Sequence, residues 1–576
     1  MCNNMHEEVR TMQLQIDGIF VEAKTGYSLL EMIRSARLDN AQFYCRPIAA
    51  KMAGEIFNLN YIPVRDHSEQ EPASLRRAVQ ASGGIVQLIR YSDPAGRDVY
   101  SRTAQFVIFL ALRQLWPKAR AKMDCTVGNA LFVEVENEPA FDALKLKERM
   151  RMLVSQNIPL IRKRLLLSEA QVLFLQDGQA DKAALLSYRK ADYFDVYSHE
   201  GFSDYYYGEL APSTGYLRVW DILPVEGGFM FLYPDDTDPE QVSGYKEMPK
   251  FLSVCTEGEK WCQLMECQTV SDLNELVRTG QIRELIRVNE ALHEKRYSQV
   301  ADMVCQRGAK VVMLAGPSSS GKTTSANRLA TQLRVHGKKP ILMSLDDYYI
   351  DRDQIKPGPD GKLDLEHIDT IDIDQFRQDL QALIRGEEVE LPSFDFKSGK
   401  RLMKGHKIRL APQTVIIIEG LHALNPILLP AGMDSNLIFK LYVSALLPLN
   451  LDDHNRIPSS LLRLLRRTVR DYETRGASVQ RTMEMWDSVR RGEKRWIFPY
   501  QEEADVIFNS STLYELPVLK KHIYALLTQI QPEEECYEQV RGLVKVLNYV
   551  LEADVDDEIP PTSLVREFIG GNSFYK

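Results

Sequence analysis

Hydrophobic and polar residues alternate in short runs near the start of the chain. Two such runs, residues 12–16 and 19–21, flank an Asp-Gly pair that supplies the positive φ angles of a tight hairpin turn. Residues 28–36 then follow a helical spacing, and Ser28 and Glu31 stand at the two positions of a capping box. The pattern predicts a small α+β module at the front of the chain.

The pattern becomes mixed between residues 75 and 235, where it predicts a helix over 103–115 and a strand over 130–135. Apolar residues recur at helical spacing over 271–296, and Gly280 predicts a break or an end within that stretch. We expect a helical connector there. Farther on, apolar strands alternate with helices, which is typical of a parallel sheet with helices on both faces. The predicted fold class is therefore multidomain, with α+β modules followed by an α/β domain.

Length and composition narrow this picture. At roughly 150 residues per domain, a chain of 576 residues predicts about four domains. Its 44% hydrophobic and 26% charged residues are globular values, and a net charge of −9 gives no global electrostatic reason to bind nucleic acid or anionic membrane. The longest apolar stretch, residues 106–112, is far shorter than the roughly 20 residues that span a bilayer. Because the N-terminus lacks a signal-peptide pattern and the eight cysteines form no CxxC motif, we expect a cytoplasmic protein with free thiols.

A phosphate-binding motif follows the apolar strand 310–315. The next residues have the pattern GxxxxGK[ST], between a predicted strand and a predicted helix that Gly337 closes. In this motif backbone amides cradle phosphate oxygens, the Lys322 ammonium reaches the β and γ phosphates, and the Thr323 hydroxyl binds Mg²⁺. The sequence thus predicts an ATP and Mg²⁺ site. The candidate nucleotide-binding residues are Gly316, Pro317, Ser318, Ser319, Ser320, Gly321, Lys322, Thr323 and Thr324.

Two carboxylates stand where predicted strands end. Asp346 follows the strand 341–345, at the edge of the sheet where open α/β proteins bind ligands, and it could accept the proton of an attacking hydroxyl. Glu419 follows the strand 414–418 and is suited to Mg²⁺ or its water ligands. The alternatives are an N-cap for Asp346 and a simple strand-end turn for Glu419.

Four arginines form a stripe on one predicted helix. Arg463, Arg466, Arg467 and Arg470 fall within an arc of about 100 degrees, and Arg475-Gly476 ends the segment. Guanidinium groups on one face suit a lid that closes over a triphosphate and stabilises the transferring group. A solvated helix face is the alternative.

Residues 310 to about 510 resemble the uridine kinase and phosphoribulokinase family of P-loop kinases. The resemblance implies that Asp346 activates a ribose 5′-hydroxyl, that Tyr349 lies at the substrate, and that Glu366 before His367 replaces an Asp that holds ribose hydroxyls. The lid motif RxxRDxxxRGR is matched except that Ala477 replaces its last Arg. By this resemblance the catalytic residues include Lys322, Arg467 and Arg470, Arg467 also contacts substrate, and Arg475 contacts the nucleotide.

The acceptor pocket departs from that family at one segment. Where uridine kinases have Tyr-Asp-Phe and a later His, this chain has Phe394-Asp395-Phe396 with Gly399 at the His position. These changes remove groups that read the edge of a pyrimidine. Phe394 and Asp395 remain candidate substrate residues.

Two further resemblances cover the front of the chain. The first module resembles a TGS domain, a ubiquitin-like module of threonyl-tRNA synthetases and some GTPases, and the match continues through residues 48–55. The region after it resembles the second additional domain of threonyl-tRNA synthetases. The positions of that family's editing cluster, an HxxxH pair with a later Cys and His, hold Arg102, Phe106, Tyr206 and Leu210 here. We expect a retained scaffold rather than an editing enzyme.

The whole arrangement resembles a bacterial nucleoside kinase family with these front domains. We expect a TGS-like domain over residues 1–74, a synthetase-like domain over 75–240, a helical connector over 241–305, a P-loop kinase domain over 306–515, and a helical tail over 516–576. The expected function is ATP- and Mg²⁺-dependent phosphorylation of a uridine- or cytidine-like nucleoside at its 5′-hydroxyl.

Two other functions stay open. One is a kinase of another small hydroxyl substrate, such as a sugar phosphate. The other is a nucleotide-dependent RNA or ribosome factor that binds through the front domains. The absence of a DxxG after the phosphate loop, and of an NKxD, weighs against a GTPase.

Overall fold

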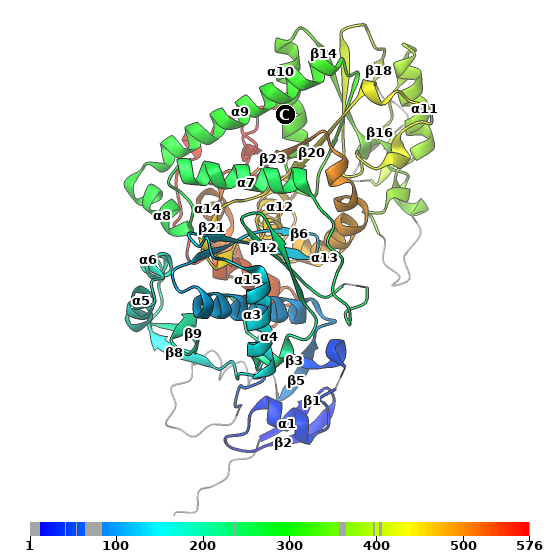
Figure 1. Ribbon diagram of the computed structural model, residues 1–576. Coiled ribbons are helices and arrows are strands. Elements are labelled where there is room, and N and C mark those ends of the chain that lie inside the picture. The colour runs from blue at the N-terminus through cyan, green and yellow to red at the C-terminus, as the bar shows by residue number, and fades with distance from the viewer. Residues whose placement is uncertain are drawn as a thin grey trace, which may run out of the picture.

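The computed structural model describes residues 12–40, 42–52, 54–63, 83–235, 237–355, 364–395, 398–402 and 406–574. The front modules lie at one end of the molecule and the parallel sheet at the other (Figure 1). None of the described helices is both long enough and apolar enough to cross a membrane. The described cysteines are free thiols, as expected. The sequence also contains a loop rich in proline and glycine over residues 356–361, whose polar groups could line an acceptor pocket or only shape turns; this loop lies outside the described residues.

The N-terminal hairpin and its helix are confirmed. Strands β1 (Met12–Ile16) and β2 (Ile19–Ala23) pair antiparallel around Asp17 and Gly18, which both have positive φ. Helix α1 (Leu29–Ser35) begins after Ser28, and both hydrogen bonds of the predicted capping box are present. Local sequence signals therefore fix this part of the fold.

The front sheet has five strands in the order β2-β1-β5-β3-β4. It is completed by β3 (Pro47–Met52), β4 (Glu55–Asn58) and β5 (Ile85–Arg90). Strand β5 lies between β1 and β3, so it belongs to this sheet although it follows the boundary that we expected at residue 74. The structure thus moves that boundary beyond residue 90.

Helix α3 (Pro94–Leu115) lies at the centre of the second module. It begins at Pro94, earlier than the predicted start at Thr103, because proline is well suited to a first helical turn. The predicted strand over 130–135 is confirmed as β7. The antiparallel sheet β11-β12-β7-β6 comprises β6 (Arg120–Val127), β7 (Ala130–Glu136), β11 (Asp221–Val225) and β12 (Gly228–Leu232). The remaining elements are α4 (Ala143–Ser155), β8 (Arg162–Leu166), α5 (Leu167–Gln176), α6 (Ala180–Leu186), β9 (Tyr193–His199) and β10 (Phe202–Asp204).

The expected connector is part of the α/β domain. Its helices are α7 (Pro249–Leu264), α8 (Val270–Thr279) and α9 (Ile282–Arg307). The predicted break is confirmed, since Gly280 ends α8 in the left-handed conformation. However, α7 shares a core with one face of the parallel sheet and α9 shares a core with the other. Helices α7 and α9 therefore cover the two faces of the sheet rather than linking two domains.

The parallel sheet has the strand order β14-β19-β13-β20-β23. Its strands are β13 (Val311–Ala315), β14 (Lys339–Ser344), β19 (Thr414–Glu419), β20 (Ile438–Ser444) and β23 (Val506–Asn509), and α10 (Lys322–Val335) follows β13. Because β13 is the central strand, the loop after it opens between the carboxyl ends of β19 and β20. The predicted α/β architecture is confirmed for this region.

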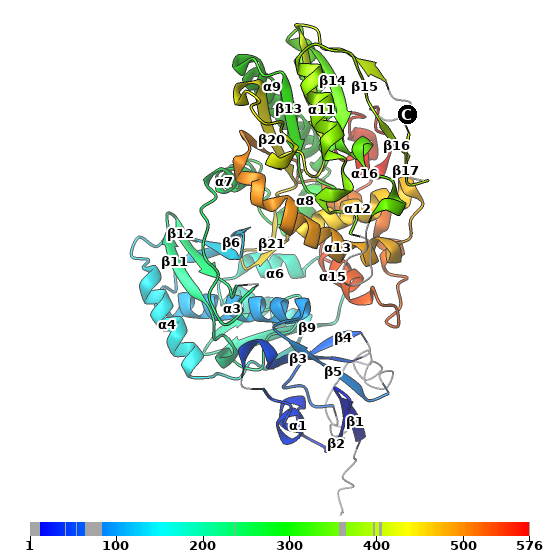
Figure 2. The ribbon, with the colours of Figure 1, turned by 90° about the vertical axis from the view of Figure 1, so that its right-hand side faces the viewer.

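The C-terminal helices pack around the lid helix rather than forming a separate tail. Helix α12 (Ser459–Arg475) shares a core with α8 and with the last helices of the chain (Figure 2). Those helices are α14 (Glu515–Leu527), α15 (Tyr537–Leu547) and α16 (Arg566–Ile569). The domain also contains α11 (Ile373–Ile384), α13 (Val479–Trp496), β15 (Val389–Glu390), β16 (Ser393–Asp395), β17 (Lys400–Leu402), β18 (Lys407–Ile408), β21 (Asn450–Asp452) and β22 (Asn455–Arg456).

Candidate active site

The loop between β13 and α10 has the geometry of an anion site. A Cβ on Gly316 would lie 2.1 Å from the Val443 carbonyl oxygen, and Gly321 has φ +86, so glycine is required at both positions. Ser319 also has positive φ, which is uncommon for a residue with a side chain. The hydroxyls of Ser319 and Ser320 are buried without hydrogen-bond partners among the described residues. Such unsatisfied donors fit a loop that is built to receive phosphate oxygens.

Lys322 and Thr323 start α10 beside the predicted acidic residues. The Lys322 ammonium donates to the Pro317 carbonyl over 3.2 Å, and burial lowers its pKa against the opposing effect of Glu419. The Thr323 hydroxyl donates to the Glu419 carboxylate over 3.3 Å. A lysine and a hydroxyl–carboxylate pair therefore meet at the mouth of the loop.

Glu419 is suited to a divalent cation. Burial, and then the proximity of Asp346, raise its pKa to about 7, because two carboxylates in one low-dielectric site repel each other. No cluster of three or more metal-ligating side chains occurs among the described residues. A site with two protein oxygens, from Thr323 and Glu419, fits Mg²⁺, which keeps several water and phosphate ligands.

Asp346 lies just beyond the carboxyl end of β14, in a short turn over Leu345–Tyr348. The side chain that caps this turn belongs to Ser344, whose hydroxyl accepts from the Asp346 amide over 3.2 Å. The N-cap alternative for Asp346 is therefore wrong. Burial raises the pKa of Asp346, whereas Lys322 and a hydrogen bond from Tyr349 lower it. Its carboxylate therefore accepts from Tyr349 rather than capping the turn.

Glu366 is a second buried carboxylate near the loop. Burial raises its pKa to about 7, and the Arg467 guanidinium opposes the shift. One of its carboxylate oxygens is buried without a hydrogen-bond partner among the described residues. Helix α13 lies directly against it, since a Cβ on Gly492 would be 2.4 Å from the Glu366 Cβ. This arrangement fits a carboxylate that accepts a hydrogen bond from a ligand hydroxyl.

The β16 segment reaches the site through one aromatic ring. The ring centroid of Phe394 lies 5.6 Å from that of Tyr349, with the rings nearly perpendicular. The Asp395 carboxylate accepts from the Ser398 amide over 3.4 Å, within the turn that joins β16 to β17. Gly399 has φ +67 in the same turn, so a histidine at that position would be strained. The structure brings Phe394 to Tyr349 and places Asp395 at the end of β16, paired with Lys400 of β17.

Three arginines of the α12 stripe donate hydrogen bonds to the phosphate loop. Arg463 is 2% exposed and donates to the Ser318 carbonyl over 3.0 Å, and Arg466 is fully buried and donates to the Ser319 carbonyl over 3.3 Å. Arg467 donates to the Ser318 hydroxyl over 2.8 Å. The alternative of a solvated helix face is therefore wrong. The expected mobile lid face is also wrong for Arg463 and Arg466, which are fixed parts of the core.

Three arginines at the end of α12 share one carboxylate. Asp471 lies 3.3 Å from Arg467, 2.9 Å from Arg470 and 3.6 Å from Arg475. Burial lowers the pKa of Arg467. A group of cations with too few counter-charges next to the loop fits an anionic ligand.

Residues 311–516 match the phosphoribulokinase / uridine kinase family. The uridine kinase of Bacillus pumilus is 32% identical over 199 residues, 34% of this chain and 84% of that protein. The uridine kinase of Macrococcus caseolyticus is 30% identical over 198 residues, covering 34% of this chain and 86% of that protein. The chain belongs to this family. The uridine kinase of Staphylococcus carnosus is 29% identical over 224 residues, 38% of this chain and 98% of that protein. The C-terminal region is therefore a P-loop kinase domain, and most of the chain lies outside these matches.

The sequence did not indicate two buried residues of the kinase domain. Glu493 of α13 is fully buried and accepts from the Ser318 amide over 3.0 Å and from Arg463. No local motif marks it, because its partners are far away in the sequence. His422 is buried beyond the end of β19, its ring lies 6.5 Å from Trp496, and neither ring nitrogen has a partner among the described residues. Burial lowers its pKa to about 4.

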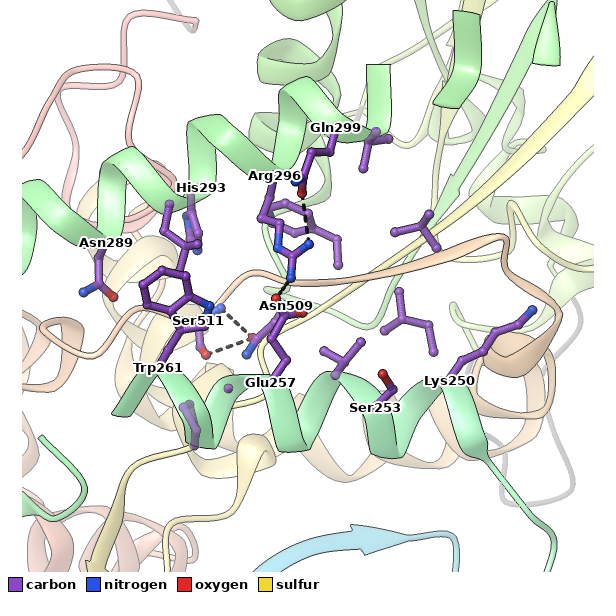
Figure 3. Close-up of a pocket in the computed structure, with 18 of the residues that line it drawn as sticks. Lys250, Ser253, Glu257, Trp261, Asn289, His293, Arg296, Gln299, Asn509 and Ser511 are labelled. Atoms are coloured by element: carbon purple, nitrogen blue, oxygen red, sulfur yellow. Dashed lines mark hydrogen bonds and ion pairs between the residues drawn. The ribbon is translucent and has the colours of Figure 1, made fainter. Parts of the chain in front are cut away.

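Two cavities lie away from the phosphate loop. One, of about 520 Å³, lies between α7, α9 and β23, where Arg296 pairs with Glu257 across it (Figure 3). The other, of about 880 Å³, lies between the front modules and helices α12 and α15 and is lined in part by Arg102 and Tyr206. Neither is the kinase site.

The four positions that correspond to the editing cluster of threonyl-tRNA synthetases hold no side chains suited to bind a metal ion. Arg102 donates to the Glu209 carbonyl over 3.1 Å, and the Tyr206 hydroxyl donates to Asp204 over 3.1 Å. The Phe106 ring centroid lies 6.5 Å from that of Tyr206, and Leu210 is fully buried. The four side chains therefore stabilise the fold through hydrogen bonds and packing.

Proposed function

We propose that the protein transfers the γ-phosphoryl group of ATP to the 5′-hydroxyl of a uridine- or cytidine-like nucleoside, with Mg²⁺. The observation that carries this proposal is the position of Asp346. Its carboxylate lies at the sheet edge where Lys322 and the Thr323–Glu419 pair meet, and it accepts from Tyr349. The matched uridine kinases are consistent with this assignment.

Each residue then has a definite task. Asp346 accepts the proton of the acceptor hydroxyl as that oxygen bonds to the γ-phosphorus and the bond to the β-phosphate oxygen breaks. The loop amides and Lys322 hold the phosphates in line, and Arg467 and Arg470 stabilise negative charge on the transferring group. Thr323 and Glu419 would hold Mg²⁺, which neutralises charge on the phosphates when it is bound.

The acceptor pocket is formed by Tyr349, Glu366 and Phe394. The unpartnered oxygen of Glu366 is placed to accept from a ribose hydroxyl, and Arg467 keeps a positive charge beside it. The rings of Tyr349 and Phe394 offer a face on which a base can pack. Because Gly399 replaces the histidine of the uridine kinase pattern, we expect weaker selection of the pyrimidine edge, and a sugar phosphate is the second candidate acceptor.

We infer that the front modules are the TGS-like and synthetase-like domains of this enzyme. The mixed five-stranded sheet with its capped helix α1 supports the ubiquitin-like assignment. The hydrogen-bonded side chains of Arg102 and Tyr206 support a scaffold without editing chemistry. We place the protein in the cytoplasm, where ATP and nucleosides are available. The net charge of −9 over the whole chain gives the protein no general affinity for RNA.

A coupled assay of ADP release tests the proposed function. Purified protein with ATP and Mg²⁺ is supplied with nucleosides or with sugar phosphates, and we expect a nucleoside to yield its 5′-monophosphate. Asp346→Asn is expected to lower kcat by at least about a hundredfold while ATP binding stays within about twofold. The matched control is Asp374→Asn, because the Asp374 side chain is 89% exposed. ADP release that only RNA or ribosomes stimulate would refute the proposal.

A further inference from the structure

The last residues of the chain lie against the phosphate loop. We call residues 563–572 the C-terminal strap. The Thr324 hydroxyl donates to the Glu567 carboxylate over 2.6 Å. Leu564 is fully buried and touches the loop so closely that a Cβ on Gly321 would lie 2.5 Å from its side chain. The strap therefore contacts two positions of the nucleotide-binding motif.

Buried polar groups fasten the strap to the kinase domain. Ser563 and Tyr514 both donate to one oxygen of Glu290 on α9, over 2.7 and 2.6 Å. The Phe568 ring lies 5.0 Å from the Arg466 guanidinium, which itself donates to the Ser319 carbonyl of the loop. Helix α16 of the strap packs against α12 (Figure 2). The same strap thus contacts the loop directly and through Arg466.

The two threonines at the start of α10 have different partners. The Thr323 hydroxyl donates to Glu419, on the side of the sheet where Asp346 lies, and the Thr324 hydroxyl donates to Glu567. In a phosphate loop the backbone amides hold the α and β phosphates and the lysine reaches the β and γ phosphates. With the γ phosphate towards Asp346, we expect the α phosphate and the nucleoside of ATP to lie on the side of Thr324 and the strap.

We propose that the C-terminal strap forms the nucleoside-side wall of the ATP site and that Glu567 is a positioning residue which fixes Thr324 and the first turn of α10. This inference rests on the proposed ATP-dependent kinase. Thr324 is fully buried beneath the strap, where its hydroxyl donates to Glu567 and accepts from the Asn572 side-chain amide over 3.5 Å. Leu564 packs against Gly321, which has the left-handed φ of +86. The strap thereby prepares the loop for the phosphates of ATP.

Equilibrium binding of a non-hydrolysable ATP analogue to the full chain, measured by calorimetry with Mg²⁺ and without acceptor, tests this inference. Glu567→Ala removes the acceptor of the Thr324 hydroxyl, and we expect about tenfold weaker binding, the effect of losing one hydrogen bond to a charged group. Glu567→Gln keeps an oxygen that can accept from Thr324, and we expect binding within about twofold of the unmodified protein. The control Glu558→Gln changes an acid on the same C-terminal region that pairs with Arg283 and Arg287.

Steady-state kinetics separate positioning from a purely structural role. With Glu567→Ala we expect a higher KM for ATP, an unchanged KM for the acceptor and a melting temperature close to that of Glu567→Gln. Binding by Glu567→Ala that equals the unmodified protein would overturn the inference. So would tighter binding by both variants, which would mean that the Glu567 charge competes with ATP. If the unmodified protein binds no ATP analogue, the proposed function fails as well, whereas binding without nucleoside turnover leaves this inference intact.

Discussion

Glu493 is the residue whose loss should damage the kinase domain most. Its side chain is fully buried. Its carboxylate accepts from Arg463 over 2.8 Å, from Arg490 over 3.1 Å and from the Ser318 amide over 3.0 Å. The Arg463 charge lowers the pKa of Glu493 although burial raises it, so the carboxylate is ionised at neutral pH. Glu493→Ala would leave Arg463 buried without its counter-charge.

Breaking a buried arginine–carboxylate pair typically costs about 3–5 kcal/mol. We expect a loss of that size for Glu493→Ala, together with weaker ATP binding because the Ser318 amide loses its acceptor. The double variant Arg463→Met with Glu493→Leu should be less destabilised, since no unpaired charge remains buried. The pKa of Glu493 is lowered in the folded protein, so its contribution is present above about pH 4.5 and is lost as the pH falls through the folded-state pKa.

Urea unfolding followed by tryptophan fluorescence measures the loss in the free energy of unfolding. The Trp486 ring lies 5.5 Å from the Arg463 guanidinium, so one of the five tryptophans that contribute to the emission lies beside the pair. Glu484→Ala is the matched control on the same helix, because Glu484 is 54% exposed and pairs with the exposed Arg481; its effect should stay within about 0.5 kcal/mol. A loss below about 1 kcal/mol for Glu493→Ala, with normal ATP binding, would refute the reasoning.

Two further predictions concern the loop and its metal. Because burial and Asp346 raise the pKa of Glu419 to about 7, Mg²⁺ affinity should increase as the pH rises through 7. The metal-free protein should lose stability as the pH rises from about 4.5 to about 7, and Glu366, whose pKa burial also raises to about 7, should contribute to this loss. Glu419→Gln should abolish the first trend in calorimetry and weaken the second in thermal melts. A pH-independent Mg²⁺ affinity would contradict this. Gly321→Ala should lower ATP affinity at least about tenfold, since φ +86 disfavours alanine and its Cβ would meet Leu564 at 2.5 Å; unchanged affinity in a binding titration would show that the loop adapts.

The sequence predicted those features that depend on neighbouring residues. The hairpin around Asp17 and Gly18, the capping box of Ser28 and the helix break at Gly280 each depend on a few adjacent side chains. Asp346 and Glu419 could be placed together because parallel strands end at one edge of a sheet. These predictions needed no knowledge of long-range contacts.

The missed features all depend on residues that are distant in the sequence. Glu493 meets Ser318 and Arg463 only because α13 folds back over the loop, and nothing around Glu493 in the sequence announces this. Glu567 stands in a segment to which the sequence assigned no chemistry.

The pairing of the α12 arginines explains how an acidic protein can hold a triphosphate. Arg463 pairs with Glu493 and Arg466 pairs with Glu515, and all four side chains are buried, so these two arginines add no net charge to the site. Their task is to hold the loop carbonyls. The next three arginines of α12, counted towards its C-terminal end, share the single carboxylate of Asp471, which leaves two uncompensated positive charges there. With Lys322, these charges concentrate the attraction for phosphate in one small region, and the net charge of −9 over the whole chain does not oppose it, because distant surface charges are screened by salt.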